Sequence, residues 1–151
     1  MKQQFSIRRA LATDRKNLKR LVRASGINRY GIHWNHFYLA VNGNGRIIGC
    51  GQLKPHRDGS LELASLAVQK RWRGRGVARC LIEELIQASD SHLWLICGSK
   101  LMSFYGKYGF KAAYNDLDKS RYFRRFYRIS SIIRRIHRPK NYTAIMYRRA
   151  A

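Results

Sequence analysis

Acidic residues are scarce in this chain. Its 151 residues include only 8 Asp and Glu against 31 Lys and Arg, which gives a formal net charge of +23. This excess attracts polyanions such as nucleic acid, an acidic membrane surface or another anionic partner, and charge alone does not choose among them. It argues against free polyamines or very basic peptide tails as preferred substrates, unless the few carboxylates cluster.

Cysteine is also sparse, and long apolar runs are absent. Cys50, Cys80 and Cys97 lie far apart without a CxxC motif, so neither a disulfide framework nor a thiolate zinc site is indicated. The histidines show no metal-ligand spacing beyond one His33/His36 pair, and we expect no metal. No apolar run reaches the roughly 18 residues that a bilayer span needs, and the N-terminal residues lack the apolar core of a signal peptide. We therefore expect a cytoplasmic protein, either soluble or peripheral on a membrane surface.

Hydrophobic residues make up 45% of the chain, enough for a sizeable core in one domain. Alternating patterns and short apolar runs predict strands at residues 5–9, 37–41, 46–54, 60–68, 92–97, 110–114 and 142–148. Helical spacing predicts one helix from an N-cap at Thr13-Asp14 to Gly26, a second from Val77 to about Gln87, and a short third near residues 101–108. No linker, internal repeat or low-complexity segment interrupts the chain, so we expect a single domain over residues 1–151.

The stretch RWRGRG, residues 71–76, joins a predicted strand to a predicted helix. A helix start exposes unpaired backbone N–H groups and a partial positive dipole, and glycines allow a phosphate to approach these donors closely. The stretch is not a Walker A loop, because no Lys-Ser/Thr pair follows the second glycine, and it lacks the third glycine of a dinucleotide fingerprint. It predicts a phosphate site or, as the simpler alternative, a basic turn.

Two motifs carry a resemblance to a known family. Residues Arg73 to Ala78 read R-x-x-G-x-A, and residues 104–110 read FYGKYGF. With both motifs in this order and at this spacing, the chain resembles the GNAT superfamily of acetyl-CoA-dependent N-acetyltransferases over roughly residues 5–114 and the last strand. The resemblance implies an α/β fold with a mixed, mostly antiparallel sheet, in which strands four and five splay apart and helices flank the sheet.

The resemblance also implies a site for acetyl-CoA as co-substrate. Backbone amides would hold its pyrophosphate at Arg73, Gly74, Arg75, Gly76, Val77 and Ala78. Its pantetheine arm would pair with strand four at Leu66, Ala67 and Val68, and an amide near Leu66 would polarise the acetyl carbonyl. Where many relatives carry Asn, this chain reads Gly98-Ser99, so it departs from the family at that element.

Two side chains take catalytic roles under this resemblance. Tyr105 matches the motif tyrosine that acts as general acid toward the departing thiolate. Its structural alternative is an aromatic residue that packs the short helix onto the sheet, a role for which Phe104 and Tyr108 are the better candidates. Glu62 lies where the family often places a general base on strand four, and its alternative is a solvent-facing residue of an alternating strand.

Residues 115–141 are the least family-like segment and separate the last two predicted strands. At about 100° per residue, one face of this segment carries Tyr122, Phe126, Ile129, Ile132, Ile133 and Ile136, with arginines opposite. The pattern predicts an inserted basic amphipathic helix around residues 120–138. Either its apolar stripe packs on the body, or it lies on an anionic membrane surface, or it docks nucleic acid or a larger protein complex.

The sequence therefore predicts an N-acetyltransferase that transfers acetyl from acetyl-CoA to a primary amine, on a protein or a small molecule, by direct attack. The alternative function is that of a catalytically idle GNAT fold that serves as a basic binding or assembly module for an anionic membrane, nucleic acid or a protein complex.

Overall fold

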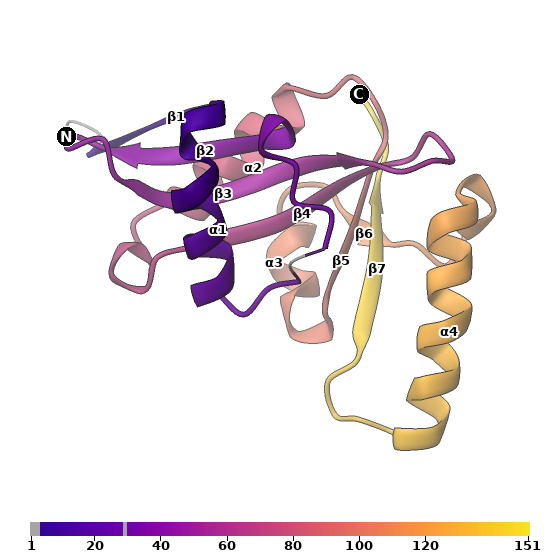
Figure 1. Cartoon of the computed structure of the whole chain (residues 1–151). Coiled ribbons are helices and arrows are strands. Elements are labelled where there is room, and N and C mark those ends of the chain that lie inside the picture. The colour runs from indigo at the N-terminus through magenta and orange to yellow at the C-terminus, as the bar shows by residue number, and fades with distance from the viewer. Residues whose placement is uncertain (1–3, 29) are drawn as a thin grey trace. The chain divides into compact units, whose positions relative to one another are not determined.

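The computed structural model describes residues 4–28 and 30–151 (Figure 1). The strands are β1 (Phe5–Arg9), β2 (Phe37–Asn42), β3 (Ile47–Pro55), β4 (Leu61–Val68), β5 (Leu93–Gly98), β6 (Lys111–Ala112) and β7 (Thr143–Arg148). The helices are α1 (Arg15–Ala24), α2 (Val77–Gln87), α3 (Met102–Gly106) and α4 (Arg121–His137). Each element lies where the sequence predicts one.

The strands form a seven-stranded sheet in the order β1-β2-β3-β4-β5-β7-β6. The pairs β1–β2, β2–β3, β5–β7 and β6–β7 are antiparallel. The pair β4–β5 is parallel, with Leu61 opposite Leu93 and Glu62 opposite Trp94. The predicted fold class, a mixed and mostly antiparallel sheet with flanking helices, is confirmed.

The chain divides into two compact units. The first contains residues up to Lys54 together with Leu63–Ser89, and the second contains Pro55–Glu62 together with Asp90–Ala151. The first unit therefore holds the glycine loop and the helices α1 and α2, whereas the second holds α3, α4 and the turn between β3 and β4.

In the first unit, β2 is buried on both faces because each face meets a helix. Phe37 and Leu39 pack with Leu18 of α1. Ala40 points to the other face, where it packs with Leu81 of α2. A strand covered on both sides does not need a polar face, which is why residues 37–41 read as an apolar run.

The helix α2 lies close to the backbone of β3 at two glycines. A Cβ atom at Gly49 would lie 3.0 Å from a methyl carbon of Val77 and 3.1 Å from the carbonyl oxygen of Ala67. A Cβ atom at Gly51 would lie 2.8 Å from a methyl carbon of Leu85. The absence of side chains at these two positions sets how near the helix approaches the strand.

The start of α1 differs from the sequence prediction. Asp14 stands at the N-cap position, but its side chain gives α1 no capping bond. Its carboxylate instead accepts hydrogen bonds from the Leu11 amide at 2.8 Å and from the Arg8 guanidinium at 2.7 Å. A charged pair with a guanidinium is stronger than a neutral capping bond, so this carboxylate ties β1 to the turn before the helix.

The second unit is built around an aromatic cluster. Phe123 of α4 is fully buried and stacks on Trp94 of β5, with ring centroids 4.6 Å apart and planes at 6°. Tyr147 of β7 tilts against the same indole at 4.7 Å, and Ala113 and Ile145 complete the cluster. Such ring pairs stabilise beyond the apolar area that they bury.

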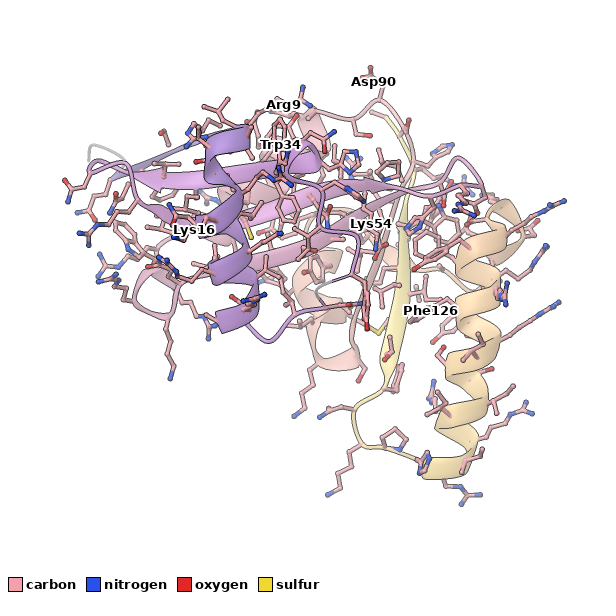
Figure 2. The ribbon with its side chains drawn as sticks, viewed as in Figure 1. Arg9, Lys16, Trp34, Lys54, Asp90 and Phe126 are labelled. Atoms are coloured by element: carbon pink, nitrogen blue, oxygen red, sulfur yellow. The ribbon has the colours of Figure 1, made fainter. Side chains whose placement is uncertain are left out.

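The helix α4 has the predicted basic, amphipathic pattern, but only part of its apolar stripe packs on the body. Of its residues only Phe123 is buried, while Phe126 points toward β7 and packs against the aromatic cluster (Figure 2). The isoleucines are exposed by 54% (Ile129), 58% (Ile132), 53% (Ile133) and 69% (Ile136). The stripe therefore packs on the body in part, through Phe126, while its four isoleucines stay more than half exposed, and the contact with Trp94 is made by Phe123, which lies outside the stripe. No helix in the described part of the chain is long and apolar enough to cross a membrane.

Gly49→Ala should lower the free energy of unfolding by about 1 to 3 kcal/mol, because the added methyl group overpacks the contact between β3 and α2. Gly43→Ala is the matched control, since a Cβ atom there meets nothing within 4 Å. Thermal unfolding followed by circular dichroism compares the two variants. Equal melting temperatures would contradict the close approach of the helix.

Candidate functional site

The loop between β4 and α2 takes its shape from two glycines. After a single 3-10 turn at Lys70–Trp72, Gly74 has φ +73° and Gly76 has φ +81°. Side chains disfavour this left-handed region, so glycine is the residue that adopts it at little cost. A Cβ atom at either glycine would meet nothing within 4 Å, so the space beside the backbone is open.

The loop leads directly into the start of α2. Gly76 is the N-cap, and it provides no side-chain hydrogen bond to the helix. Its carbonyl oxygen accepts the first helical bond, from the Cys80 amide at 3.0 Å. The amides of the first turn have no partner within a helix, and together with the helix dipole they favour an anion.

A basic groove adjoins this loop in the first unit. Its volume is about 950 Å³, and among the described residues its lining includes no carboxylate. Five cationic side chains line it: Arg20, Arg46, Lys70, Arg71 and Arg73. Arg20 comes from α1, Arg46 directly precedes β3, and the other three lie in the segment that follows β4. A groove with this charge suits a ligand that carries several phosphates.

The loop arginines are held in place by neutral partners. The Nε of Arg73 donates to the carbonyl oxygen of Val68 at 3.2 Å, and the Nε of Arg71 donates to the side-chain oxygen of Gln69 at 3.3 Å. The guanidinium of Arg75 lies 5.3 Å from the ring centroid of Trp72. A guanidinium has five N–H donors, so these contacts orient the arginines and leave further donors for a ligand.

The middle of β4 contains a backbone conformation that the sequence does not indicate. Ser65 has φ +55°, which is uncommon for a residue with a side chain. Its hydroxyl accepts a hydrogen bond from the Gln52 side chain at 2.8 Å. The left-handed residue lies within the strand, directly before the predicted pantetheine contacts, of which Ala67 is buried and Leu66 and Val68 are half-buried.

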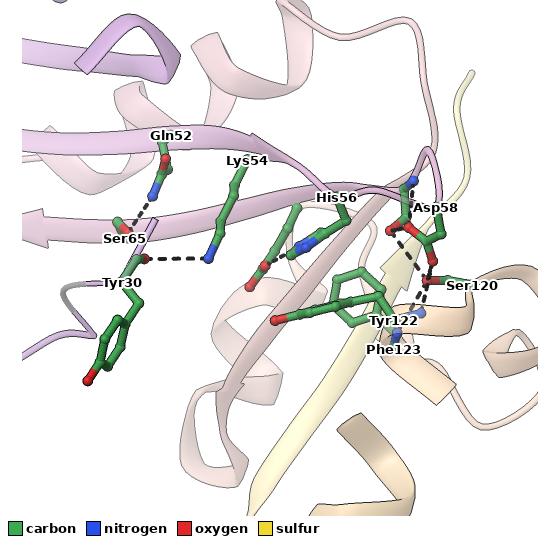
Figure 3. Close-up of polar contacts among 11 residues, drawn as sticks. Tyr30, Gln52, Lys54, His56, Asp58, Ser65, Ser120, Tyr122 and Phe123 are labelled. Carbon is green, nitrogen blue, oxygen red and sulfur yellow. Dashed lines mark hydrogen bonds and ion pairs between the residues drawn. The ribbon is translucent and has the colours of Figure 1, made fainter. Parts of the chain in front are cut away.

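In the second unit, Glu62 forms a buried pair with His56. The Nε2 atom of His56 lies 2.7 Å from a carboxylate oxygen of Glu62, and the two side chains are 7% and 9% exposed (Figure 3). The ring of His56 stacks on Tyr122 at 3.7 Å and meets the edge of Phe123 at 5.4 Å. The alternative that Glu62 faces solvent is therefore wrong, because the aromatic residues at the start of α4 enclose its partner.

Sequence reasoning missed His56 as the partner of Glu62. The two residues flank the turn between β3 and β4, where the His56 amide donates to the Ser60 carbonyl oxygen at 2.9 Å. Such a turn brings residues on its two arms together, which is the signal that could have linked them. Burial raises the pKa of Tyr122, and the nearby charges of Glu62 and Asp58 raise it further.

Asp58, at the tip of this turn, holds the first turn of α4. Its carboxylate accepts hydrogen bonds from the Ser120 hydroxyl at 2.6 Å, the Tyr122 amide at 2.9 Å and the Ser60 hydroxyl at 2.6 Å (Figure 3). Partial burial alone would raise the pKa of Asp58, but these bonds outweigh it and hold the pKa well below its usual range.

Tyr105 lies within α3 and is buried, with 9% of its surface exposed. Burial raises its pKa to about 12, with smaller contributions from Cys97 and Tyr108. Its ring meets the edges of Phe104 at 5.1 Å and Phe110 at 6.2 Å. Phe104 and Tyr108 are only half-buried, whereas Tyr105 is buried, so the expectation that Phe104 and Tyr108 do the packing in its place is wrong. The phenol keeps its proton at neutral pH.

The structure brings the predicted coenzyme-binding residues together in the first unit, where Leu66–Val68 lead into Arg73–Ala78. It holds both predicted catalytic residues, Glu62 and Tyr105, in the second unit. At the position where the chain departs from the family, the Ser99 hydroxyl accepts a hydrogen bond from the Tyr142 amide at 3.3 Å. No group of three or more possible metal ligands occurs within residues 4–28 and 30–151.

Solved structures of acetyltransferases share this fold. N-acetylglutamate synthase from Neisseria gonorrhoeae, in complex with coenzyme A and N-acetyl-glutamate, is 23% identical with a TM-score of 0.71, and the match covers 97% of this chain and 35% of that one. A protein from Mycobacterium tuberculosis in complex with CoA is 18% identical with a TM-score of 0.72, covering 97% of this chain and 99% of that one. A GNAT family N-acetyltransferase from Escherichia coli in complex with CoA is 20% identical with a TM-score of 0.59, covering 75% and 72%. This chain spans only about a third of the gonococcal enzyme and, at these identities, the likeness concerns the fold.

A comparison with curated proteins finds no match. A family-level comparison does: residues 33–112, more than half of the chain, match the family described as the acetyltransferase (GNAT) domain. The matched segment runs from the approach to β2 through the glycine loop and the buried tyrosine to β6. With the glycine loop, the uncapped helix start and the shared fold, this match places the chain in the GNAT acetyltransferase family.

Proposed function

We propose that this protein transfers an acetyl group from acetyl-CoA to a primary amine by direct attack of the amine on the thioester. The observation that carries the proposal is the loop from Arg73 to Ala78, where two left-handed glycines lead into an uncapped helix start beside a basic groove. Coenzyme A carries a diphosphate and a further phosphate, so this combination of backbone donors and cations fits its charge. Membership of the GNAT family supports acyl transfer as the chemistry.

In this proposal the backbone of the chain does most of the binding. The amides of residues 73–78 hold the diphosphate, and Arg71, Arg73 and Arg75 add charge-assisted contacts. The backbone of Leu66–Val68 pairs with the pantetheine arm, and an amide near Leu66 polarises the acetyl carbonyl. Acetyl-CoA supplies the thioester, whose carbon–sulfur bond breaks as the new carbon–nitrogen bond forms.

Two protons must move, and two buried residues are suited to move them. An amine of lysine type has a pKa of about 10.4, so its deprotonation at pH 7 costs roughly 4 to 5 kcal/mol. Glu62, held by His56 at 2.7 Å, accepts the proton that the ammonium form of the acceptor loses before attack, and this proton passes to solvent. Tyr105 provides the proton that the departing sulfur needs, and the second proton that the nitrogen loses, once it is bonded to the acetyl carbon, replaces it.

The pKa of Tyr105 sets the form of its contribution. Because its pKa is about 12 and that of a free thiol is about 8.5, full proton transfer to a thiolate would be uphill by roughly 3 to 4 units. Tyr105 therefore acts by donating a hydrogen bond to the sulfur as charge develops there, and completes the transfer only as the nitrogen, now bonded to the acetyl carbon, loses its second proton.

The acceptor is an amine without a large positive charge. The net charge of +23 repels polycations, which disfavours polyamines. The gonococcal enzyme was solved with N-acetyl-glutamate, and an amine with an acidic remainder would suit the basic surface of this chain.

Thiol release from acetyl-CoA, measured over a panel of acidic, neutral and polycationic amines, tests the proposal. Binding of CoA without turnover of any amine would support the alternative, a catalytically idle GNAT fold that serves as a binding module.

Gly76→Val should weaken CoA binding at least about tenfold, because the side chain strains a left-handed position and obstructs the loop amides. Gly26→Val is the matched control: Gly26 has φ +67° and open space around it, but lies after α1. Isothermal titration measures both dissociation constants in variants that remain folded. An unchanged affinity in Gly76→Val would remove the coenzyme from this loop.

Tyr105→Phe should lower kcat by about tenfold to a thousandfold with little change in CoA affinity, because only the hydroxyl is lost. Tyr127→Phe, in the aromatic cluster of α4, is the control. Since the pKa of Tyr105 lies near 12, wild-type activity should show no loss from this group between about pH 7 and pH 10. Wild-type turnover in Tyr105→Phe would leave the residue a packing role alone.

Glu62→Gln should lower kcat at neutral pH while its amide keeps the contact with His56. The deficit should shrink as the pH approaches about 10, because the acceptor amine then loses its proton without help. Glu83→Gln, on the exposed side of α2, is the control and should leave kcat unchanged both at neutral pH and near pH 10. Pairs of pH–rate profiles compare the variants, and a deficit that stays constant with pH would argue against a role as base.

A further inference from the structure

The helix α4 presents three different faces. Phe123 and Tyr127 face the aromatic cluster and define the packing face. At about 100° per residue, the four exposed isoleucines centre on a direction roughly 130° from Phe123. Going around the helix from Phe123 to the isoleucines, Phe126 lies on one side. Arg124, Arg128 and Arg135 lie on the other side and form the third face. The isoleucine face therefore lies away from the packing face, with Ile129 and Ile133 beside the groove that leads to β7 and Ile132 and Ile136 outside that groove.

The isoleucine face is apolar and flanked by cations. Ile132 and Ile136 are the most exposed of its residues, while Ile129 and Ile133 extend over a groove of about 460 Å³ toward β7. No Asp or Glu occurs from Arg121 to His137, and Arg138 and Lys140 extend the positive charge beyond the helix. Arg125 lies within the apolar face, and an arginine there can extend its guanidinium to the edge.

The helix is held at both ends before any partner arrives. At its start, Ser120 accepts a hydrogen bond from the Phe123 amide at 3.2 Å and donates one to Asp58 at 2.6 Å. Near its other end, the guanidinium of Arg134 lies 3.8 Å from the ring centroid of Tyr142, in the segment that leads to β7. A preformed helix avoids the ordering cost that a disordered segment would meet on binding.

We propose that α4 is a membrane-contacting element that lies in the interface of an anionic lipid bilayer. The exposed isoleucines insert between the lipid headgroups and the first acyl carbons, while the flanking arginines contact lipid phosphates. Nucleic acid would engage the arginines but leave the isoleucines in water, whereas an anionic bilayer satisfies both. The contact is peripheral, and it does not depend on acetyl transfer.

The test uses the full chain and vesicles of phosphatidylcholine with about 30 mol% phosphatidylglycerol. The protein should co-sediment with these vesicles far more than with pure phosphatidylcholine, and added salt should weaken the association. Ile132→Ser/Ile136→Ser should weaken it about tenfold or more, because both side chains lie outside the groove and the core. Leu11→Ser/Leu101→Ser, which removes two aliphatic side chains exposed elsewhere, should leave it unchanged.

A second pair of variants separates this helix from the general charge of the protein. Arg128→Gln/Arg135→Gln should weaken vesicle binding by roughly tenfold or more. Lys16→Gln/Arg23→Gln removes the same charge from the exposed side of α1 and should have a small effect. All four variants should keep the wild-type melting temperature and CoA affinity.

Three results would overturn the proposal. Equal vesicle binding by Ile132→Ser/Ile136→Ser and wild type would show that the isoleucines do not insert. Equal losses in the two charge-reduced variants would assign the attraction to overall charge. Tighter binding to a fluorescent DNA duplex than to the anionic vesicles, unaffected by the isoleucine substitutions, would make nucleic acid the partner of this surface.

Discussion

The carboxylate of Asp58 organises the second unit. It accepts hydrogen bonds from the Ser120 hydroxyl and the Tyr122 amide, and so fixes the first turn of α4 beside the turn between β3 and β4. That position sets Tyr122 on the ring of His56, which in turn holds Glu62. In a chain with 8 acidic residues against 31 basic ones, each carboxylate has many possible partners, so its geometry and not its charge alone decides what it holds together.

The two longest helices show opposite uses of the same physical feature. The first amides of any helix lack partners within it. At α4, the hydroxyl of Ser120 accepts from one of these amides and the carboxylate of Asp58 accepts from another. These amides therefore stabilise the fold and are not available to a ligand. At α2, Gly76 offers no side chain, so the helix start stays available to an anion. The two starts thus differ in the side chains that accept from their amides, Ser120 and Asp58 at α4 and no capping side chain at Gly76 of α2.

The order of elements and the glycine loop could be predicted from the sequence because each depends on local patterns. Hydrophobic periodicity locates strands and helices, and the positive φ of Gly74 and Gly76 is what glycine between a strand and a helix indicates. The left-handed Ser65 could not be predicted, because its conformation depends on the strands around it. The turn between β3 and β4 could have indicated that His56 pairs with Glu62, but the burial of the pair depends on Tyr122 and Phe123, which are distant in sequence. Periodicity also shows which residues share a face of α4, but not which face meets the body.

The close contact of α2 with Gly49 and Gly51 limits how this protein can diverge. Any step away from glycine places at least a methyl group between helix and strand. The strand is held by its hydrogen-bonded neighbours, so the displacement falls on α2, whose first amides adjoin the glycine loop. A substitution inside the sheet would then change the affinity for a ligand that the substituted residue does not contact. Descendants of this protein could retune coenzyme affinity through these buried positions while every residue of the loop stays the same.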